Sequence, residues 1–181
     1  MLIQRKNSLL LLIDLQQKLA PAIADIEQVT ASALWLVQIA QQLDVPVLAT
    51  EQYPQGLGGT LAPLSALLSP EQIIEKIHFS AWREVAFQQH LVRAGRQQIV
   101  IAGTEAHVCV LQTALDLCSA GYQVFLVVEA TGARTASNKT LALGRLQQAG
   151  VVIVSQEMLA FEWLERAGTD LFRHINQGWI R

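Results

Sequence analysis

The stretch "IVIAGTEAHVCVLQTALDL", residues 99–117, runs from the end of one strand-like segment into the start of a helical one. Its apolar run stops at Gly103, a few small and polar residues follow, and Cys109 then precedes an amphipathic helical pattern. Strand, loop and helix in this order form the unit from which parallel sheets covered by helices are built. Two interpretations of Cys109 are open at this point: a small residue of the hydrophobic core, or a nucleophile at a helix N-terminus.

The same unit recurs along the chain, so the stretch predicts the fold. Five apolar segments and a more mixed one predict strands at Leu9–Asp14, Val45–Thr50, Gln72–Ile77, Gln98–Ala102, Gln123–Val128 and Val151–Val154. Continuous apolar runs are typical of parallel strands covered on both faces. Helical patterns between them end at glycines 95, 121 and 150. We predict an α/β fold: one domain over residues 1–181, a Rossmann-like three-layer α/β/α sandwich with a mainly parallel sheet of about six strands.

Composition narrows the class of partner. The chain has 181 residues, of which 51% are hydrophobic and 15% charged, with a formal net charge of -2. Neither a basic nucleic-acid surface nor a polybasic membrane patch is visible. We therefore expect a small-molecule substrate, no nucleic acid and no membrane.

The N-terminus and the cysteines favour a cytoplasmic location. Residues 1–24 mimic a signal peptide, but Asp14 ends the apolar stretch early, and a buried strand explains it better. No run approaches the roughly 18 apolar residues of a membrane span. Cys109 and Cys118 lie on one predicted helix, beyond disulfide reach and on opposite sides. A chain without a disulfide framework fits a reducing compartment.

Polar residues follow the ends of the predicted strands. Asp14 closes the first strand, Glu51 follows the second, Lys76 lies near the end of the third, and Glu129 follows the fifth. The loop 103–109 follows the fourth. Ligands of open α/β sheets bind beyond the carboxyl ends of the strands. We expect these groups to converge at one edge of the sheet.

Three residues, Asp14, Lys76 and Cys109, have side chains that together could catalyse acyl transfer. A helix N-terminus offers free N–H donors and a positive dipole end, which would stabilise a Cys109 thiolate and an adjacent oxyanion. Asp14 could accept the thiol proton, and the Lys76 ammonium would keep that carboxylate ionised and favour the thiolate. A thiol, a base and an acid suffice for acyl transfer, in which water finally releases the acid.

Each residue also has a structural interpretation. A cysteine is more often a core residue than a catalyst, an aspartate at a strand end is usually a cap or turn former, and a lysine is usually solvated. We assign Cys118 to the core on that ground. Because Asp14, Lys76 and Cys109 all lie at strand ends, a shared catalytic site is favoured over three unrelated structural roles.

These motifs resemble the isochorismatase-like cysteine hydrolase superfamily, which includes nicotinamidases and carbamoylsarcosine amidase-like enzymes. The matching stretches stand in the family's order and span residues 9–164: "LLLIDLQQKL", "TEQYPQGLG", "EKIHFSAW", "GTEAHVCVLQTALDL" and "EMLAFEWL". The resemblance is strongest to a subgroup with the pattern TEQYP-x-GLG, most of whose members have no assigned substrate.

The resemblance implies roles for individual residues. Cys109 would be the nucleophile, Asp14 the general base and then acid, and Lys76 the group that orients and polarises. The family's non-proline cis peptide would fall between Thr104 and Glu105. The backbone N–H groups of Glu105 and Cys109 would form the oxyanion hole.

The sequence departs from the nicotinamidase pattern after the second strand. Nicotinamidases have an aspartate and two histidines there to hold a metal, whereas "TEQYPQGLGGT" has Glu51 and no histidine. The four histidines show no metal-ligand spacing. We predict no metal and no other cofactor, and nicotinamide becomes a doubtful substrate. The segment "QYPQGLGG" resembles a lid, and the candidate pocket walls are Leu19, Tyr53, Phe79, Ser80, Trp82, Thr104 and His107.

The sequence thus predicts a metal-independent cysteine hydrolase that cleaves a C–N (amide-type) bond of a small molecule through a thioester. Three alternatives stay open: an isochorismatase-type enzyme that cleaves an enol ether, against which Cys109 argues; a non-catalytic binding or scaffold protein; and a redox-sensitive protein that uses the Cys109 thiol. We also expect a homo-oligomer. The apolar C-terminal stretch 163–180 would pack either on a neighbouring subunit or on its own domain.

Overall fold

A computed structural model describes residues 1–180, and its centre is a six-stranded, all-parallel sheet in the order β3-β2-β1-β4-β5-β6. The strands are β1 (Ser8–Ile13), β2 (Val47–Gln52), β3 (Ile73–Lys76), β4 (Gln98–Gly103), β5 (Gln123–Thr131) and β6 (Val152–Val154). All six coincide with segments predicted from the apolar pattern, to within a few residues at each end. The predicted parallel sheet is confirmed.

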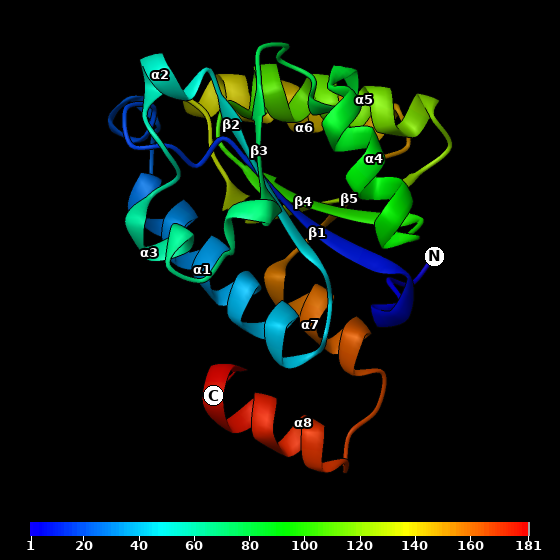
Figure 1. Ribbon diagram of the computed structural model, residues 1–181. Helices are drawn as coiled ribbons and strands as arrows, with labels where there is room; N and C mark the ends of the chain where they lie inside the picture. The colour runs from blue at the N-terminus through cyan, green and yellow to red at the C-terminus, as the bar shows by residue number, and fades with distance from the viewer. Residues whose placement is uncertain (181) are drawn as a thin grey trace.

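Helices cover both faces of the sheet, as Figure 1 shows. They are α1 (Ile26–Gln42), α2 (Pro54–Leu57), α3 (Ala62–Ser65), α4 (Val85–Ala94), α5 (Leu111–Ser119), α6 (Ala136–Gln148), α7 (Gln156–Leu164) and α8 (Asp170–Ile175). Helices α1 and α7 lie on one face, and α4, α5 and α6 lie on the other (Figure 1). The three-layer α/β/α architecture is confirmed. Within residues 1–180, no helix is both long and apolar enough to span a membrane.

The two helical layers explain why the strands are apolar throughout. In β1, Leu10 and Leu12 belong to the core shared with α1, whereas Leu9, Leu11 and Ile13 belong to the core shared with α4 and α5. Because successive side chains of a strand point to opposite faces, both sets must be hydrophobic. The single domain over residues 1–181 stays a prediction.

The end of β4 approaches β1 very closely at Gly103. A Cβ atom on Gly103 would lie 2.2 Å from the carbonyl oxygen of Ile13, and its φ of +152° is one that side-chain-bearing residues rarely adopt. Only glycine fits this approach. It brings the loop that leads to Cys109 directly beside Asp14, the residue that follows β1.

The C-terminal stretch packs on its own chain. The Trp35 indole in α1 donates a hydrogen bond to the carbonyl oxygen of Trp179 at 2.7 Å, and the Trp179 indole donates to Gln38 Oε1 at 3.2 Å. Leu171 and Phe172 pack against the same core as α1 and α7. Of the two interpretations left open by the sequence, packing on the parent domain is the one observed.

Candidate active site

A buried ion pair joins two distant strand ends. Asp14 Oδ2 lies 2.8 Å from Lys76 Nζ, and both side chains are 0% exposed. Asp14 directly follows β1, and Lys76 is the last residue of β3, with β2 between them. Unpaired charges are very unfavourable in such a place, so each residue compensates the charge of the other.

Neighbouring polar groups hold both charges in place. Thr50 donates its hydroxyl proton to Asp14 Oδ1 at 2.8 Å. Lys76 Nζ donates to Gln52 Oε1 at 2.6 Å and to the carbonyl oxygen of Phe79 at 3.0 Å. The carboxylate and the ammonium are therefore fixed in orientation before any ligand arrives.

Cys109 lies against this pair. It belongs to a π-helical turn, Ala106–Val110, that leads into α5, and it is 3% exposed. Its Sγ atom lies 4.0 Å from Gln52 Oε1, the same oxygen that accepts from Lys76 Nζ, and both Asp14 and Lys76 shift the pKa of its thiol. The three residues singled out in the sequence come together in the structure.

The environment of Cys109 favours the neutral thiol. Burial raises the pKa of Cys109 most, the Asp14 carboxylate raises it further by charge and by accepting the thiol proton in a hydrogen bond, and Lys76 opposes both. The net shift is upward, far from the neutral range. Lys76 favours the thiolate, as the sequence led us to expect, but desolvation and the adjacent carboxylate outweigh its effect.

The loop before Cys109 turns without a cis bond. The Thr104–Glu105 peptide is trans, since residues 1–180 contain no cis peptide, so the predicted cis bond is wrong. The chain reverses instead through Gly103 and through Glu105, whose φ of +55° and ψ of +53° are left-handed. The Glu105 backbone N–H finds no hydrogen-bond partner within residues 1–180, and so it is free to meet an oxyanion.

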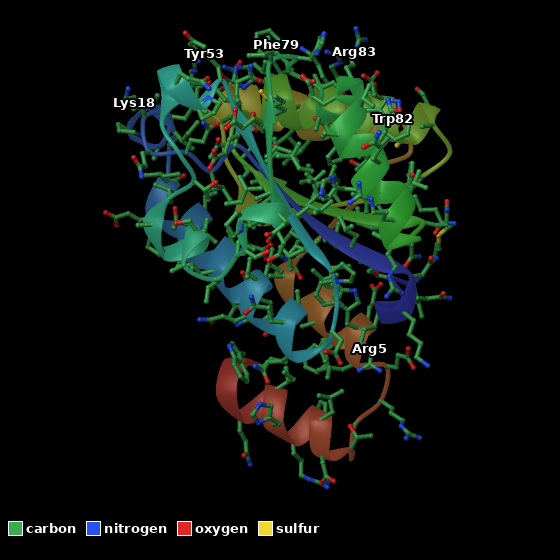
Figure 2. The ribbon with its side chains drawn as sticks, in the orientation of Figure 1. Arg5, Lys18, Tyr53, Phe79, Trp82 and Arg83 are labelled. Atoms are coloured by element: carbon green, nitrogen blue, oxygen red, sulfur yellow. The ribbon has the colours of Figure 1, made fainter. Side chains whose placement is uncertain are left out.

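The predicted pocket walls differ in their placement. Tyr53 and Phe79 are each 52% exposed and project from the upper margin of the molecule in Figure 2. Leu19, Ser80 and Thr104 are buried. The Thr104 hydroxyl donates to the Asp14 carbonyl oxygen at 2.5 Å, a contact that positions the backbone.

The other two predicted walls are His107 and Trp82. His107 is partly exposed, and its Nδ1 atom lies 3.7 Å from Glu105 Oε2. Trp82 packs edge-on against Tyr122, with ring centroids 5.6 Å apart, just beyond the C-terminal end of α5. Cys109 precedes the opposite end of that helix, so Trp82 is the predicted wall that the structure separates from the thiol.

The sequence analysis missed Gln52 and chose Glu51 instead. Gln52 Oε1 accepts a hydrogen bond from Lys76 Nζ and lies 4.0 Å from Cys109 Sγ. The Gln52 backbone exchanges hydrogen bonds with the Gln16 side-chain amide at 2.8 and 3.0 Å. Thr50 and Gln52 share one face of β2 because strand side chains alternate, and Thr50 binds Asp14. Alternation along "TEQ" was the signal that could have found them.

Glu51 points to the other side and anchors the glycine-rich segment. Its Oε1 atom accepts hydrogen bonds from the backbone N–H of Thr60 at 2.6 Å and from the Thr60 hydroxyl at 2.7 Å. Within residues 1–180, no three His, Cys, Asp or Glu side chains gather as metal ligands would. At the position where nicotinamidases are expected to bind metal, this chain ties down a loop.

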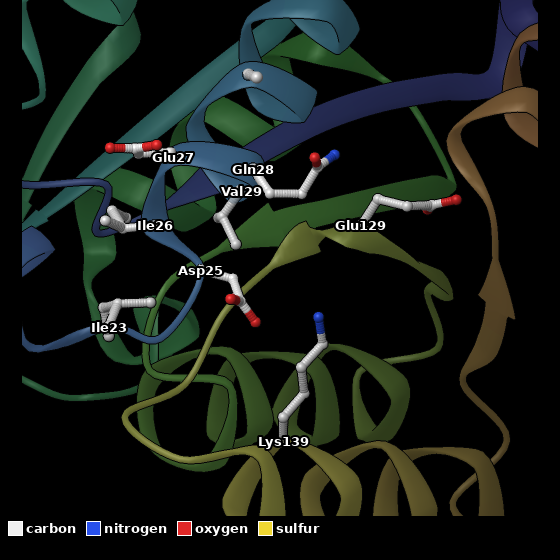
Figure 3. A pocket seen from close by; sticks show the side chains of 9 residues that line it. Ile23, Asp25, Ile26, Glu27, Gln28, Val29, Glu129 and Lys139 are labelled. Carbon is white, nitrogen blue, oxygen red and sulfur yellow. The ribbon is translucent and has the colours of Figure 1, made fainter.

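Glu129 does not join the Cys109 group, contrary to the sequence expectation. It lines a hollow of about 930 Å³ together with Asp25 of the α1 N-terminus and Lys139 of α6, as Figure 3 shows. Burial lowers the pKa of Lys139, and the carboxylates of Asp25 and Glu129 partly offset that effect. The residues lining this hollow do not include Asp14, Lys76 or Cys109, because Glu129 lies within β5 rather than beyond its end.

Comparison with known proteins places the chain among close structural relatives. Residues 8–158 match the Isochorismatase domain. "Isochorismatase domain-containing protein 2A" of Mus musculus is 36% identical over 174 residues, which are 95% of this chain and 82% of the relative. The solved structure of MAR1 ribonuclease from Caenorhabditis elegans has a TM-score of 0.91 and 31% identity, covering 98% of this chain and 91% of that one. The YcaC gene product of Escherichia coli, described as an octameric hydrolase of unknown specificity, has a TM-score of 0.86 and 26% identity, covering 91% and 83%.

Proposed function

Because this chain belongs to the isochorismatase family, whose fold is that of a hydrolase, we propose that it hydrolyses the C–N bond of an amide-type small molecule with Cys109 as nucleophile. The observation that carries the proposal is the contact of a buried thiol with a buried carboxylate–ammonium pair. A thiol next to a base that is itself held by a cation is the arrangement expected of an activated nucleophile. Such a pair has little value as a purely stabilising feature.

The first half of the reaction forms a thioester. Cys109 Sγ attacks the carbonyl carbon while its proton passes to Asp14, so that a C–S bond forms and negative charge develops on the carbonyl oxygen. The backbone N–H groups of Glu105 and Cys109 are the proposed donors to that oxygen. The C–N bond then breaks, and Asp14 returns the proton to the departing amine.

The second half releases the acid. A water molecule gives a proton to Asp14 and attacks the thioester carbon, the C–S bond breaks, and the proton returns to Cys109 sulfur. Lys76 pairs with Asp14 and orients its carboxylate for both transfers. The upward shift of the Cys109 pKa supports this order of events, because a thiol that is neutral at rest needs a base at the moment of attack.

A metal-independent reaction is part of the proposal. It is supported by the hydrogen bonds of Glu51, which stands where a nicotinamidase would have a metal ligand, to the backbone and hydroxyl of Thr60. Tyr53 and Phe79 are the exposed aromatic side chains next to the site, and they are proposed as part of the substrate entrance. The segment 52–59 is proposed as a lid in its closed position, in which Gln16 and Lys18 bind its Gly58 and Gly56 carbonyls.

The experiment that tests the function combines turnover with trapping of the intermediate. Incubation with a panel of small primary and substituted amides is expected to release ammonia or amine, with no loss after dialysis against a chelator. Acid quenching followed by intact-mass analysis should show one acyl group per chain. Cys109→Ala should remove both turnover and adduct, whereas the matched variant Cys118→Ala should keep both. An adduct on another residue, or turnover by Cys109→Ala, would refute the proposal.

The name of the Caenorhabditis elegans neighbour makes ribonuclease activity the second function to test. The formal net charge of -2 does not favour binding of RNA phosphates. A labelled RNA should therefore stay intact in the same assay, and Cys109-dependent cleavage would replace the amidase proposal. Peroxide-sensitive Cys109 without turnover on any amide would instead support the redox alternative, and a protein inert in both assays would support a scaffold. The cytoplasmic location stays a prediction.

Self-association is expected as well. The Escherichia coli neighbour is described as octameric, and Tyr53, Ile77 and Phe79 are exposed apolar side chains near the candidate site. Light scattering coupled to size-exclusion chromatography should give a mass that is a multiple of the 19.9 kDa chain. A single 19.9 kDa species at micromolar concentration would contradict this.

A further inference from the structure

Glu105 is a buried carboxylate in a strained backbone position next to the candidate nucleophile. Its side chain is 5% exposed, and its φ of +55° is left-handed. A glutamate adopts this conformation only where its surroundings impose it. Glu105 is also the residue whose backbone N–H is proposed to bind the oxyanion. The groups that impose its conformation therefore bear on the reaction.

Two backbone hydrogen bonds fix the chain on either side of Glu105. The Ala106 N–H donates to the carbonyl oxygen of Gly132 at 2.9 Å, and the Gly132 N–H donates to the carbonyl oxygen of Gly103 at 2.9 Å. These bonds join the loop after β4 to the loop after β5. They hold the neighbours of Glu105, and a third bond, donated by the Val108 N–H at 2.8 Å, holds the Glu105 carbonyl oxygen.

Arg134 supplies the contact to the Glu105 side chain. Its Nε atom donates to Glu105 Oε1 at 2.7 Å from the loop between β5 and α6. Glu105 Oε2 finds no hydrogen-bond partner in the described residues, and the His107 Nδ1 atom is 3.7 Å away. The Arg134 side chain is 59% exposed, so it reaches in from the surface to hold a buried anion.

This arrangement is poor as a device for stability. A buried carboxylate with one strong partner and one unsatisfied oxygen loses more by desolvation than it gains, and an apolar side chain would fill the same space at less cost. A side chain kept there despite that cost fits a role in geometry. The anchor sets the orientation of the peptide plane that carries the Glu105 N–H.

We infer that Glu105 and Arg134 are positioning residues: their ion pair holds the left-handed turn that presents the Glu105 N–H to the substrate's carbonyl oxygen. The inference rests on the proposed function, and it assigns a role to the side chains of Glu105 and Arg134, which touch neither the substrate nor the thiol. Loss of the ion pair would let Glu105 relax toward right-handed backbone and rotate its N–H away. Acylation of Cys109 would then slow, while the thiol and Asp14 stay as they are.

The test compares two reactions of the same sulfur. Acylation by p-nitrophenyl acetate passes through an oxyanion, whereas alkylation by iodoacetamide displaces iodide from a saturated carbon and does not. Arg134→Met and Glu105→Gln are expected to lower the acylation rate constant about 10- to 100-fold with KM nearly unchanged. In both variants the rate constant for alkylation of Cys109 by iodoacetamide should stay within about twofold of the wild-type value. Arg134→Lys, which keeps the cation, should recover part of the acylation rate.

The control is Arg173→Met, which breaks an exposed arginine–aspartate contact with Asp170 in α8. Both reactions should keep their wild-type rates in this variant. Unchanged acylation in Arg134→Met and Glu105→Gln overturns the inference, and so does an equal loss of acylation and alkylation, which would mean that the loop has collapsed. A wild-type protein that is not acylated at Cys109 overturns the proposed function and this inference together.

Discussion

Replacement of Asp14 by asparagine is expected to lower kcat/KM for amide hydrolysis by about 10⁴-fold and at the same time to speed the alkylation of Cys109. Hydrolysis fails because the asparagine amide cannot accept the thiol proton or return it to the leaving amine. Alkylation needs no such transfer, since iodoacetamide reacts with whatever thiolate is present. The two measurements should therefore move in opposite directions.

The sign of the second effect follows from the environment of the thiol. The Asp14 carboxylate raises the pKa of Cys109 through its charge and its hydrogen bond, whereas the Lys76 ammonium lowers it. Asparagine removes the carboxylate and leaves the Lys76 ammonium, so the pKa of Cys109 falls and more thiolate exists at a given pH. Lys76→Met removes the opposite influence and should slow alkylation. In the wild type the rate should rise about tenfold per pH unit without a plateau below about pH 9.

Cys118 provides a control within the same molecule. Burial alone raises its pKa, with no contribution from Asp14 or Lys76. Quenched iodoacetamide labelling with peptide mass analysis reports both cysteines at once, and only Cys109 should respond to Asp14→Asn. Slower or unchanged alkylation of Cys109 in that variant would show that the carboxylate does not act on the thiol, and the proposed proton transfer would fail with it.

The sequence was sufficient for the fold and for the central residues because both depend on short-range patterns. Continuous apolar runs identify strands that are covered on both faces, and Figure 1 shows the helices that cover them. Asp14 and Lys76 could be found because parallel strands end at the same edge, so polar residues at those ends must meet. No contact had to be known for this argument, only the direction of the strands.

The remaining features depend on three-dimensional packing that no local pattern encodes. Glu51 and Gln52 are adjacent in sequence, yet one binds Thr60 and the other Lys76, because the strand turns them to opposite sides. The pKa of Cys109 depends chiefly on how deeply the turn buries the thiol, which the residues around Cys109 in the sequence do not indicate. Glu129 was misplaced because β5 continues to Thr131, beyond its predicted end at Val128.

The buried pair predicts an unusually large loss of stability when one partner is removed. Lys76→Met is expected to lower the free energy of unfolding by about 3–5 kcal/mol, because the buried Asp14 side chain would lose its cationic partner and keep the Thr50 hydroxyl as its side-chain donor. Urea unfolding followed by circular dichroism measures this loss. The double variant Asp14→Asn/Lys76→Met should lose clearly less than the sum of the two single variants, since neither charge is then left unpaired.

The contrast with an exposed pair separates burial from ion pairing as the cause. Arg83 Nε and Asp116 Oδ2 are 3.1 Å apart, but the arginine side chain is 63% exposed, so Arg83→Met should cost no more than about 1 kcal/mol. Equal losses in Lys76→Met and Arg83→Met would mean that water reaches the Asp14–Lys76 pair. A water-filled pair could not raise the Cys109 pKa as described, so this one comparison also bears on the proposed protonation state of the nucleophile.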